Sequence, residues 1–492
     1  MKRFISIVLT FALLFGIIAM PASAISAKAP ANTVDAAETD YNGYPFILVR
    51  GMEISLLVHK LGTAEEEPAF RGINAGELIF KLLKAIANGI VHWNIDYFVD
   101  DVIDYVDKTL GLLACNKDGT SKYDVSVQEY PLALSNYPEF VNSLTDDNEW
   151  GILKTACEKY GSKNVYYYMY DWRLDPFMHA DKINDMVKRA LEDSGKDKVN
   201  IVCASMGGIM TESYLYKYGT QDVNRVIFLS STFCGTYVTT DLFAGKAVIE
   251  PDALYNFVYQ KLGGSNAVIG LLYRGLEKIG SFERIANLGN KLIAKIKDKV
   301  YDEFLSPVFG TMPSLWALCL PDGYDEDIEF MFGGKEDEYA DLIALTEEYQ
   351  KMAAARNEFL QEDEDFFFDI IASYGTANIP VYLRGGENGD GTLESGPMLG
   401  FAKVARTGQT LGDGYKGQRV SPDNVCDLSD VLYPENTWAI SGSPHVACHY
   451  GTDYSDFVFW ILSCEGRVTV DTNPKYPQFM KSSDKMELEL YK

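Results

Sequence analysis

Short apolar runs alternate with amphipathic segments along the first half of the chain. Val, Ile, Leu and aromatic residues dominate these runs, which predict buried strands. The runs lie at residues 45–51, 164–172, 199–204 and 226–230. Between them, residues 181–193 carry apolar side chains at the helical spacing, and a second helix is expected over about 206–218. Strands that alternate with helices indicate an α/β fold with a mostly parallel sheet covered by helices on both faces.

The alternation is lost between residues 235 and 375, where the pattern is helical and the charge changes from basic to strongly acidic. We interpret this segment as a large helical cap inserted over the carboxyl edge of the sheet; an independent second domain is the alternative. Apolar runs at 379–384 and 437–440 predict the return of the sheet. The expected organisation is a core over 25–234, a cap over 235–375 and the second part of the core over 376–492.

The first 24 residues have the three parts of a secretory signal peptide. A basic start, Lys2 and Arg3, precedes an apolar run at residues 4–20. Residues 22–24, Ala-Ser-Ala, form a small-residue cleavage site. An uncleaved anchor helix is the alternative, although the apolar run is short for a membrane span. We therefore expect a secreted, extracellular protein that is soluble after cleavage near Ala24.

Acidic residues outnumber basic ones, 70 Asp and Glu against 44 Lys and Arg, which gives a formal net charge of −26. This balance argues against nucleic acid as a partner, because such binding depends on Lys and Arg that neutralise phosphates. It also disfavours electrostatic adhesion to anionic membranes. The 8 Cys contain no C-x-x-C pair, so the spacing of a zinc ribbon is absent. We expect no metal and no cofactor, and the pairing of the cysteines stays open.

The run at 199–204 ends abruptly at Ser205, which lies in the sequence Cys-Ala-Ser-Met-Gly. A strand that turns at once into a helix raises its serine hydroxyl above the sheet edge, and this strained elbow presents the nucleophile of α/β-hydrolases. The usual pattern is G-x-S-x-G, in which small residues let the strand and helix backbones pass closely. Here Cys203 replaces the first glycine. A buried serine that merely ends a strand is the alternative interpretation.

A serine hydroxyl needs a base to accept its proton and a carboxylate to orient that base. In α/β-hydrolases these partners follow the serine in the chain order acid, then histidine, each after a strand. Asp390 lies in a glycine-rich loop after the predicted strand at 379–384. His445 follows the predicted strand at 437–440. The order therefore predicts a catalytic triad in which Ser205 is the nucleophile, Asp390 the acid and His445 the base.

Each of the two partners has an alternative. Glu387 is the reserve candidate for the acid, and the loop around Asp390 is also compatible with a plain glycine-rich turn. A calcium loop is excluded because Gly386 occupies the first ligand position, where a carboxylate is needed. His449 is the alternative base, since only it and His445 follow the last predicted strand. The other three histidines precede the serine and are in the wrong order.

The oxyanion that forms when a serine attacks an ester needs backbone N–H groups aimed at it. One is expected from Met206, the residue after the nucleophile. The other is expected from the turn after the first strand, with Met52 as the donor. Both assignments follow from position in the chain.

Five motifs occur in a fixed order along the chain: Tyr-Asp-Trp-Arg-Leu at 170–174, Ser-Met-Gly-Gly at 205–208, Met-Pro-Ser at 312–314, Gly-Asp-Gly-Thr at 389–392 and the segment 445–462. Together they resemble the lecithin:cholesterol acyltransferase family, which includes phospholipid:diacylglycerol acyltransferases and bacterial esterase-like members. The resemblance implies an α/β-hydrolase fold and a lipid-like acyl donor. It also implies that Ser205, Asp390 and His445 match the family's nucleophile, acid and base.

Three positions depart from this family. Cys203 replaces the elbow glycine, Ala204 stands where many members carry His, and Arg50 replaces the proline before the oxyanion glycine. Within the first motif, we interpret Asp171 and Arg173 as a buried ion pair that braces the strand end, with substrate contact as the alternative.

These features predict a secreted serine hydrolase that cleaves a lipid or another acyl ester through an acyl-enzyme. Transfer of a fatty acyl group from a phospholipid to an alcohol is the first alternative. A catalytically inactive cell-surface binding protein is the second. The cap, with its aromatic residues Phe366–Phe368, could line an acyl channel and contact a lipid interface transiently, although ordinary helix packing explains the same residues.

Overall fold

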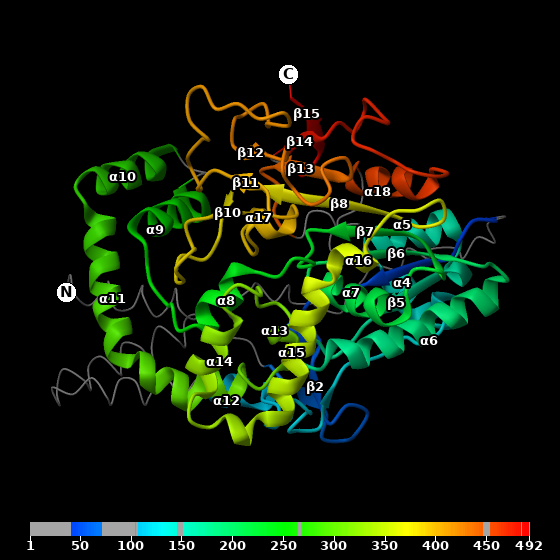
Figure 1. The fold of residues 1–492 in the computed structure, drawn as a ribbon, viewed down its shortest axis with the longest axis horizontal. Coiled ribbons are helices and arrows are strands. Elements are labelled where there is room, and N and C mark those ends of the chain that lie inside the picture. Colours follow the sequence, from blue (N-terminus) through cyan, green and yellow to red (C-terminus); the bar gives the residue numbers. More distant parts are fainter. Residues whose placement is uncertain are drawn as a thin grey trace.

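The computed structural model describes residues 41–70, 104, 107–144, 151–263, 267–445, 453–483 and 485–491. The predicted signal peptide lies outside them. An eight-stranded sheet forms the centre of the molecule, in the order β15-β14-β13-β8-β7-β6-β1-β5 (Figure 1). Neighbouring strands are parallel except for β14 and β15. The strands are Phe46–Val49 (β1), Val165–Tyr168 (β5), Val199–Ala204 (β6), Val223–Leu229 (β7), Phe367–Tyr374 (β8), Thr437–Ser441 (β13), Phe479–Ser482 (β14) and Leu488–Leu490 (β15).

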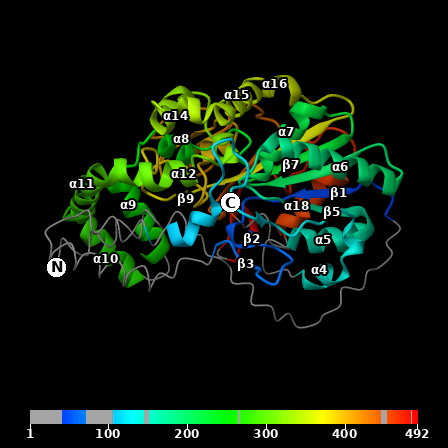
Figure 2. The ribbon, with the colours of Figure 1, turned by 90° about the horizontal axis from the view of Figure 1, so that it is seen from below.

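The central strands are covered on both faces. Every residue of β1, β5, β6 and β8 is buried, which explains why these strands read as continuous apolar runs instead of an alternating pattern. On one face lie α6 (Pro176–Ser194) and α7 (Gly207–Tyr218), and on the other α5 (Gly151–Tyr160) and α18 (Asp453–Ser463), as Figure 2 shows. The predicted α/β class with a mostly parallel sheet is confirmed.

Helix α6 shows how local sequence sets the ends of these elements. Pro176 occupies its first turn, and the Asp175 carboxylate caps it by accepting hydrogen bonds from the N–H groups of Phe177 and Met178 at 2.8 and 3.2 Å. Gly195, in the left-handed conformation at φ 66°, ends the helix. The helix predicted at 181–193 lies within α6, which begins five residues earlier and ends one residue later, and the second predicted helix corresponds to α7.

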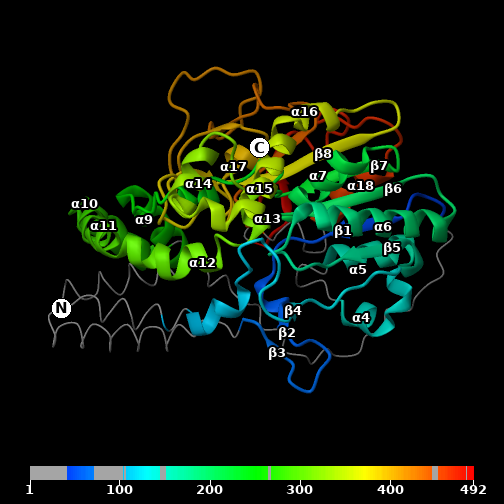
Figure 3. The same cartoon turned by 60° about the horizontal axis from the view of Figure 1, so that its bottom comes forward.

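A helical insertion separates β7 from β8 (Figures 1 and 3). Its helices are α8 (Tyr237–Phe243), α9 (Pro251–Val258), α10 (Ala267–Lys278), α11 (Ser281–Val300), α12 (Ser306–Val308), α13 (Pro313–Trp316), α14 (Tyr324–Phe332), α15 (Ala340–Ala354) and α16 (Arg356–Phe359). Helix α16 packs against α7, whereas α10 and α11 lie far from the sheet, at the left of Figure 1. The predicted boundary at residue 375 is wrong, because the sheet already resumes at Phe367.

The predicted strand at 379–384 is also wrong. Ile379 and Val381 belong to a small apolar cluster with side chains of the insertion, and Tyr382 makes one isolated bridge, to Ala247. The apolar run is thus buried against the insertion instead of paired into the sheet. The strand is β8, which begins at Phe367, within the segment that we assigned to the cap. Phe366, Phe367 and Phe368 are all buried, and the last two belong to the sheet.

Short elements complete the described fold. They are β2 (Val58–His59), β3 (Glu67–Pro68), β4 (Val125–Ser126), α4 (Pro138–Ser143), β9 (Thr376–Ala377), β10 (Asn388–Gly389), α17 (Ser395–Met398), β11 (Lys403–Val404) and β12 (Cys426–Asp427). Strands β9 and β10 form the antiparallel pair that leads into the loop containing Asp390. In the part of the chain that the structure describes, none of the helices has the length and apolar character needed to span a membrane.

Candidate active site

Ser205 lies at the abrupt turn between β6 and α7. Its φ is 51°, a left-handed conformation that a residue with a side chain adopts only when its surroundings enforce it. Its N–H donates to the carbonyl of Leu229 at 3.0 Å, which anchors the turn to the neighbouring strand. A methyl group on Gly207 would lie 2.4 Å from the carbonyl oxygen of Val49, so only glycine permits this close passage of α7 over β1. These features match a nucleophile elbow.

Cys203, the departure from the usual elbow glycine, lies in β6 in register with Val49 on one side and Phe228 on the other. It is fully buried, and its thiol donates to the carbonyl of Ile227 at 3.5 Å. Burial raises the pKa of this thiol well above its usual range, so it is an inert packing group. The larger residue is therefore accommodated without disturbing the turn.

His445 links Ser205 to Asp390 through both of its ring nitrogens. Its Nε2 lies 2.9 Å from Oγ of Ser205, and its Nδ1 lies 2.6 Å from Oδ2 of Asp390. Asp390 is 1% exposed and His445 7%, so the hydrogen bond between them is nearly shielded from solvent, whereas Ser205 is partly exposed. With Nδ1–H donated to the carboxylate, Nε2 is left unprotonated and can accept the serine proton.

The Asp390 carboxylate is fixed by its own turn. Oδ1 accepts hydrogen bonds from the N–H groups of Thr392 and Leu393 at 3.0 and 2.9 Å, which leaves Oδ2 directed at the imidazole. The backbone N–H of His445 donates to the carbonyl of Asp390 at 3.0 Å, so the two loops are joined through main chain and side chain alike. Asp390 follows β10 instead of the predicted strand at 379–384.

The alternative residues lie elsewhere. Glu387 is paired with Arg406 at 3.8 Å, and among its described contacts there is none to His445. Burial raises the pKa of the Glu387 carboxyl, which disfavours its ionised form. His449 falls outside the described residues. His179, one of the three earlier histidines, is buried with a pKa lowered to about 4 and is hydrogen-bonded to Tyr168 and to the backbone carbonyl of Asp171, as a structural residue is.

The two segments expected to supply the oxyanion donors lie next to Ser205. Met206 is the N-cap of α7, where backbone N–H groups are not used within the helix. On the other side, a methyl group on Gly51 would lie 2.7 Å from Cβ of Ser205 and 3.3 Å from its Oγ, so the turn that continues to Met52 passes directly beside the serine. That turn is anchored by Arg50, whose N–H donates to Tyr168 and whose carbonyl accepts from the Tyr170 hydroxyl.

The predicted buried pair of Asp171 and Arg173 is present. Arg173 is fully buried and its Nε donates to Oδ1 of Asp171 at 2.9 Å. Its Nη1 also donates to the carbonyl of Leu113, and its Nη2 to Oγ of Ser121. The guanidinium thus fastens the segment around residues 113–121 to the strand end, which agrees with the structural interpretation.

Sequence reasoning missed the polar contacts that connect the catalytic loops. Thr232 donates to the carbonyl of Ser205 through its N–H at 3.1 Å and its hydroxyl at 3.3 Å. Glu394, only four residues after Asp390, is buried and accepts three hydrogen bonds from outside its own loop. Nothing in the local sequence signals these contacts, because their partners lie far away along the chain.

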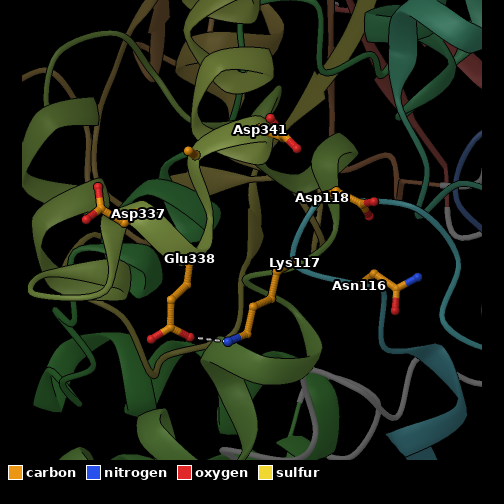
Figure 4. A pocket seen from close by; sticks show the side chains of 7 residues that line it. Asn116, Lys117, Asp118, Asp337, Glu338 and Asp341 are labelled. Carbon is orange, nitrogen blue, oxygen red and sulfur yellow. Dashed lines mark hydrogen bonds and ion pairs between the residues drawn. The ribbon is translucent and has the colours of Figure 1, made fainter.

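A surface pocket of about 330 Å³ lies at other residues (Figure 4). It is lined by Asn116, Lys117, Asp118, Asp337, Glu338, Ala340 and Asp341. Lys117 and Glu338 form an ion pair, while the side chains of Asp337 and Asp341 lie apart from each other. Among the described residues, no group of three or more His, Cys, Asp or Glu could hold a metal ion. The residues that line the pocket include none of Ser205, His445 and Asp390.

No family model and no curated protein matches this chain. Among solved structures, 14 chains match it. One of them is described as the crystal structure of the Tle4–Tli4 complex; it is 9% identical to this chain, with a TM-score of 0.31, and the match covers 67% of this chain and 75% of that one. A similarity at this level carries no argument about function, so the function has to be inferred from the geometry of the site.

Proposed function

We propose that the protein is a serine hydrolase with an α/β-hydrolase fold that cleaves carboxylic esters through an acyl-enzyme. The observation that carries this proposal is the hydrogen-bonded chain from Ser205 through His445 to Asp390, which begins on a strained strand-to-helix turn. The order of the sheet and the chain order serine, acid, histidine also support it.

In this proposal the first half-reaction forms the acyl-enzyme. Oγ of Ser205 attacks the ester carbonyl carbon while Nε2 of His445 accepts the hydroxyl proton. Asp390 stabilises the resulting imidazolium through its hydrogen bond to Nδ1. The backbone N–H groups of Met206 and Met52 stabilise the oxyanion of the tetrahedral intermediate. The intermediate collapses when the C–O bond to the leaving alcohol breaks, and Nε2–H protonates that alcohol.

The second half-reaction releases the acyl group. Water replaces the departed alcohol, His445 accepts one of its protons, and the water oxygen attacks the acyl carbonyl carbon. Breakage of the bond to Oγ then returns the proton to Ser205 and yields a carboxylic acid. If an alcohol replaces water in this step, the same residues transfer the acyl group. The motif resemblance to the lecithin:cholesterol acyltransferase family favours a lipid acyl donor for either outcome, and the predicted signal peptide favours an extracellular site of action.

Labelling with a fluorophosphonate tests the proposal. The probe phosphonylates only a serine whose hydroxyl is activated, so the native protein should be labelled in a one-to-one ratio and Ser205→Ala not at all. The matched control is Ser143→Ala, a change at an exposed serine at the end of α4, which should be labelled like the native protein. A well-folded native protein that takes up no label would contradict the proposal and favour a binding protein that has kept the fold without the chemistry.

Product analysis separates hydrolysis from transfer. The native protein is incubated with a mixed lipid extract, with and without an added long-chain alcohol, and the products are identified by mass spectrometry. A hydrolase releases free fatty acid in both cases. Fatty acyl ester of the added alcohol, formed in place of free acid, would identify a transferase instead.

A further inference from the structure

We propose that Glu394 is a positioning residue that couples the turn holding Asp390 to the segment beside Ser205. The inference rests on the proposed function, and it adds a residue to that site which contacts neither the serine nor the histidine in the structure. Three sets of contacts support it. The first are the hydrogen bonds of Glu394 itself, the second join the turn that precedes Glu394 to Asp390, and the third join the hydrogen-bond partners of Glu394 to Ser205.

Glu394 is a buried carboxylate with three donors aimed at it. Its side chain is 1% exposed although it sits at the start of the short helix α17. Oε2 accepts from the N–H of Tyr237 at 3.0 Å, and Oε1 accepts from the N–H of Val238 at 3.0 Å. Oε1 also accepts from the hydroxyl of Tyr382 at 2.5 Å. These donors belong to the first turn of α8 and to the segment that precedes Asp390, so one carboxylate joins two parts of the chain.

On one side, Glu394 ends the turn that fixes the acid. Its neighbour Leu393 donates its N–H to Oδ1 of Asp390 at 2.9 Å and accepts the N–H of Asp390 at 3.1 Å. Gly389, the residue before the acid, forms an isolated bridge with Glu394. A shift of Glu394 therefore displaces the same turn that directs the Asp390 carboxylate at the imidazole.

On the other side, the partners of Glu394 lead back to the nucleophile. Helix α8 begins directly after Thr236, which ends the segment that leaves β7. In this segment the N–H and hydroxyl of Thr232 both donate to the carbonyl of Ser205, and the N–H of Gly235 donates to the carbonyl of Thr232 at 2.7 Å. The path from Glu394 through the start of α8 to Ser205 thus consists of main chain held by hydrogen bonds.

A second contact between the same two segments supports this coupling. Asp241 of α8 is buried and accepts from Nη2 and Nε of Arg384 at 2.7 and 3.1 Å, while the backbone N–H of Arg384 donates to its Oδ2 at 2.9 Å. The Arg384 guanidinium also lies 4.0 Å from the ring centre of Tyr237. Helix α8 is consequently hydrogen-bonded to the segment around Asp390 twice, once through its first turn and once through Asp241. Of these two contacts, the one made by Glu394 is closer to Asp390 along the chain.

The test compares Glu394→Gln with Glu387→Gln. Glutamine keeps the shape of Glu394 but replaces one accepting oxygen with an NH₂ group that faces a donor, which misplaces the turn. We expect kcat for ester hydrolysis to fall about tenfold to a hundredfold with KM nearly unchanged, because bound substrate is not contacted. Glu387 lies in the same loop and pairs with Arg406, not with α8, so its variant should keep the native kcat. Unchanged kcat in folded Glu394→Gln would overturn the inference.

A second measurement does not depend on turnover. The proton on Nδ1 of His445, shared with Asp390, gives a low-field proton NMR signal that reports the geometry of that hydrogen bond. We expect the signal to shift or broaden in Glu394→Gln and to stay unchanged in Glu387→Gln. The same signal in both variants would contradict positioning by Glu394, whether or not the native protein hydrolyses esters. If Glu394→Gln does not fold, Tyr382→Phe removes one of the three donors and should cause a smaller shift in the same direction, and no shift would count against the inference.

Discussion

At the scale of single residues, the strained backbone of Ser205 directs its hydroxyl towards His445. A left-handed conformation at a residue with a side chain costs on the order of 1–3 kcal/mol, and the surrounding hydrogen bonds must offset that cost. Ser205 has them in the bonds from its N–H to Leu229 and from Thr232 to its carbonyl. The strained turn therefore has a role in the proposed mechanism, because it directs the Ser205 hydroxyl away from β6 and α7 and towards Nε2 of His445.

Substitution of the base is the sharpest test at this scale. We expect His445→Ala to lower kcat for p-nitrophenyl ester hydrolysis by at least about a thousandfold, because this change removes the imidazole that is hydrogen-bonded to the Ser205 hydroxyl. Initial rates at saturating substrate measure this effect. His449→Ala should keep the native rate. Loss of activity in His449→Ala with retention in His445→Ala would mean that the base is the second histidine.

The residues of the candidate site differ in how far the sequence could predict them. Ser205 and His445 each follow a buried strand that the apolar pattern reveals, and parallel strands bring their carboxyl ends to one edge of the sheet. Chain order points to Asp390, whose carboxylate lies beside His445 in the structure, although the segment assigned as the strand before it is not a strand. Glu394 could not be predicted at all, because its role depends on Tyr237 and Val238, 157 and 156 residues away.

At the scale of elements, the site depends on how closely β1, β6 and α7 approach one another. The turn after β1 passes so near the elbow that Gly51 has no space for a side chain beside Ser205. The same turn supplies the proposed oxyanion donor Met52. Close packing of these elements therefore holds the proposed nucleophile and brings the turn that contains Gly51 beside it.

Gly51→Ala tests this dependence. The added methyl group would lie 2.7 Å from Cβ of Ser205, too close for either group to stay in place. We expect kcat to fall about a hundredfold, with the melting temperature lowered by only a few degrees, because the clash is confined to one turn. Gly275→Ala is the matched control, since nothing lies within 4 Å of its added methyl group in α10. Native kcat in Gly51→Ala would show that the turn is not coupled to the serine.

The errors in predicting the elements have one physical cause. An apolar run shows that a segment is buried, but not which partner buries it. In the segment 379–384, Ile379 and Val381 are packed against the insertion and not paired into a sheet. Strand β8 was not predicted, because it begins within a run of phenylalanines that directly follows an acidic segment. Both segments are buried, and only the three-dimensional structure shows that the second one pairs between β7 and β13.

At the scale of the whole molecule, acidic residues exceed basic ones, and several of the carboxyl groups are buried in the fold. Asp327, in the first turn of α14, is fully buried, and its carboxyl group lies beside the Cys319 thiol. Burial raises the pKa of Asp327 from its ordinary value of 3.8 to about 7, and the nearby Cys319 thiol and Lys246 ammonium offset this only in part. The insertion therefore contains a carboxyl group that keeps its proton up to about pH 7.

This burial makes stability depend on pH in a predictable direction. Because the pKa is higher in the folded protein than in the unfolded chain, the folded state binds the proton more tightly, and Asp327 costs stability as the pH rises from about 4 to about 7. Asn, which cannot ionise, avoids this cost. We expect Asp327→Asn to increase the free energy of unfolding at pH 8 by about 2–4 kcal/mol relative to its effect at pH 4. Urea unfolding at a series of pH values measures the difference.

The control for this prediction is Asp325→Asn, an exposed residue in the same first turn of α14, where the interaction with the helix dipole is shared. It should change stability little and to the same extent at both pH values, because its carboxylate remains in water. If the two variants showed the same pH dependence, the effect would not come from burial of Asp327, because the exposed Asp325 shares the helix dipole but not the burial. An advantage of Asp327→Asn that grows from pH 4 to pH 7 and is constant above it would instead show that the cost comes from ionisation of this one buried carboxyl group.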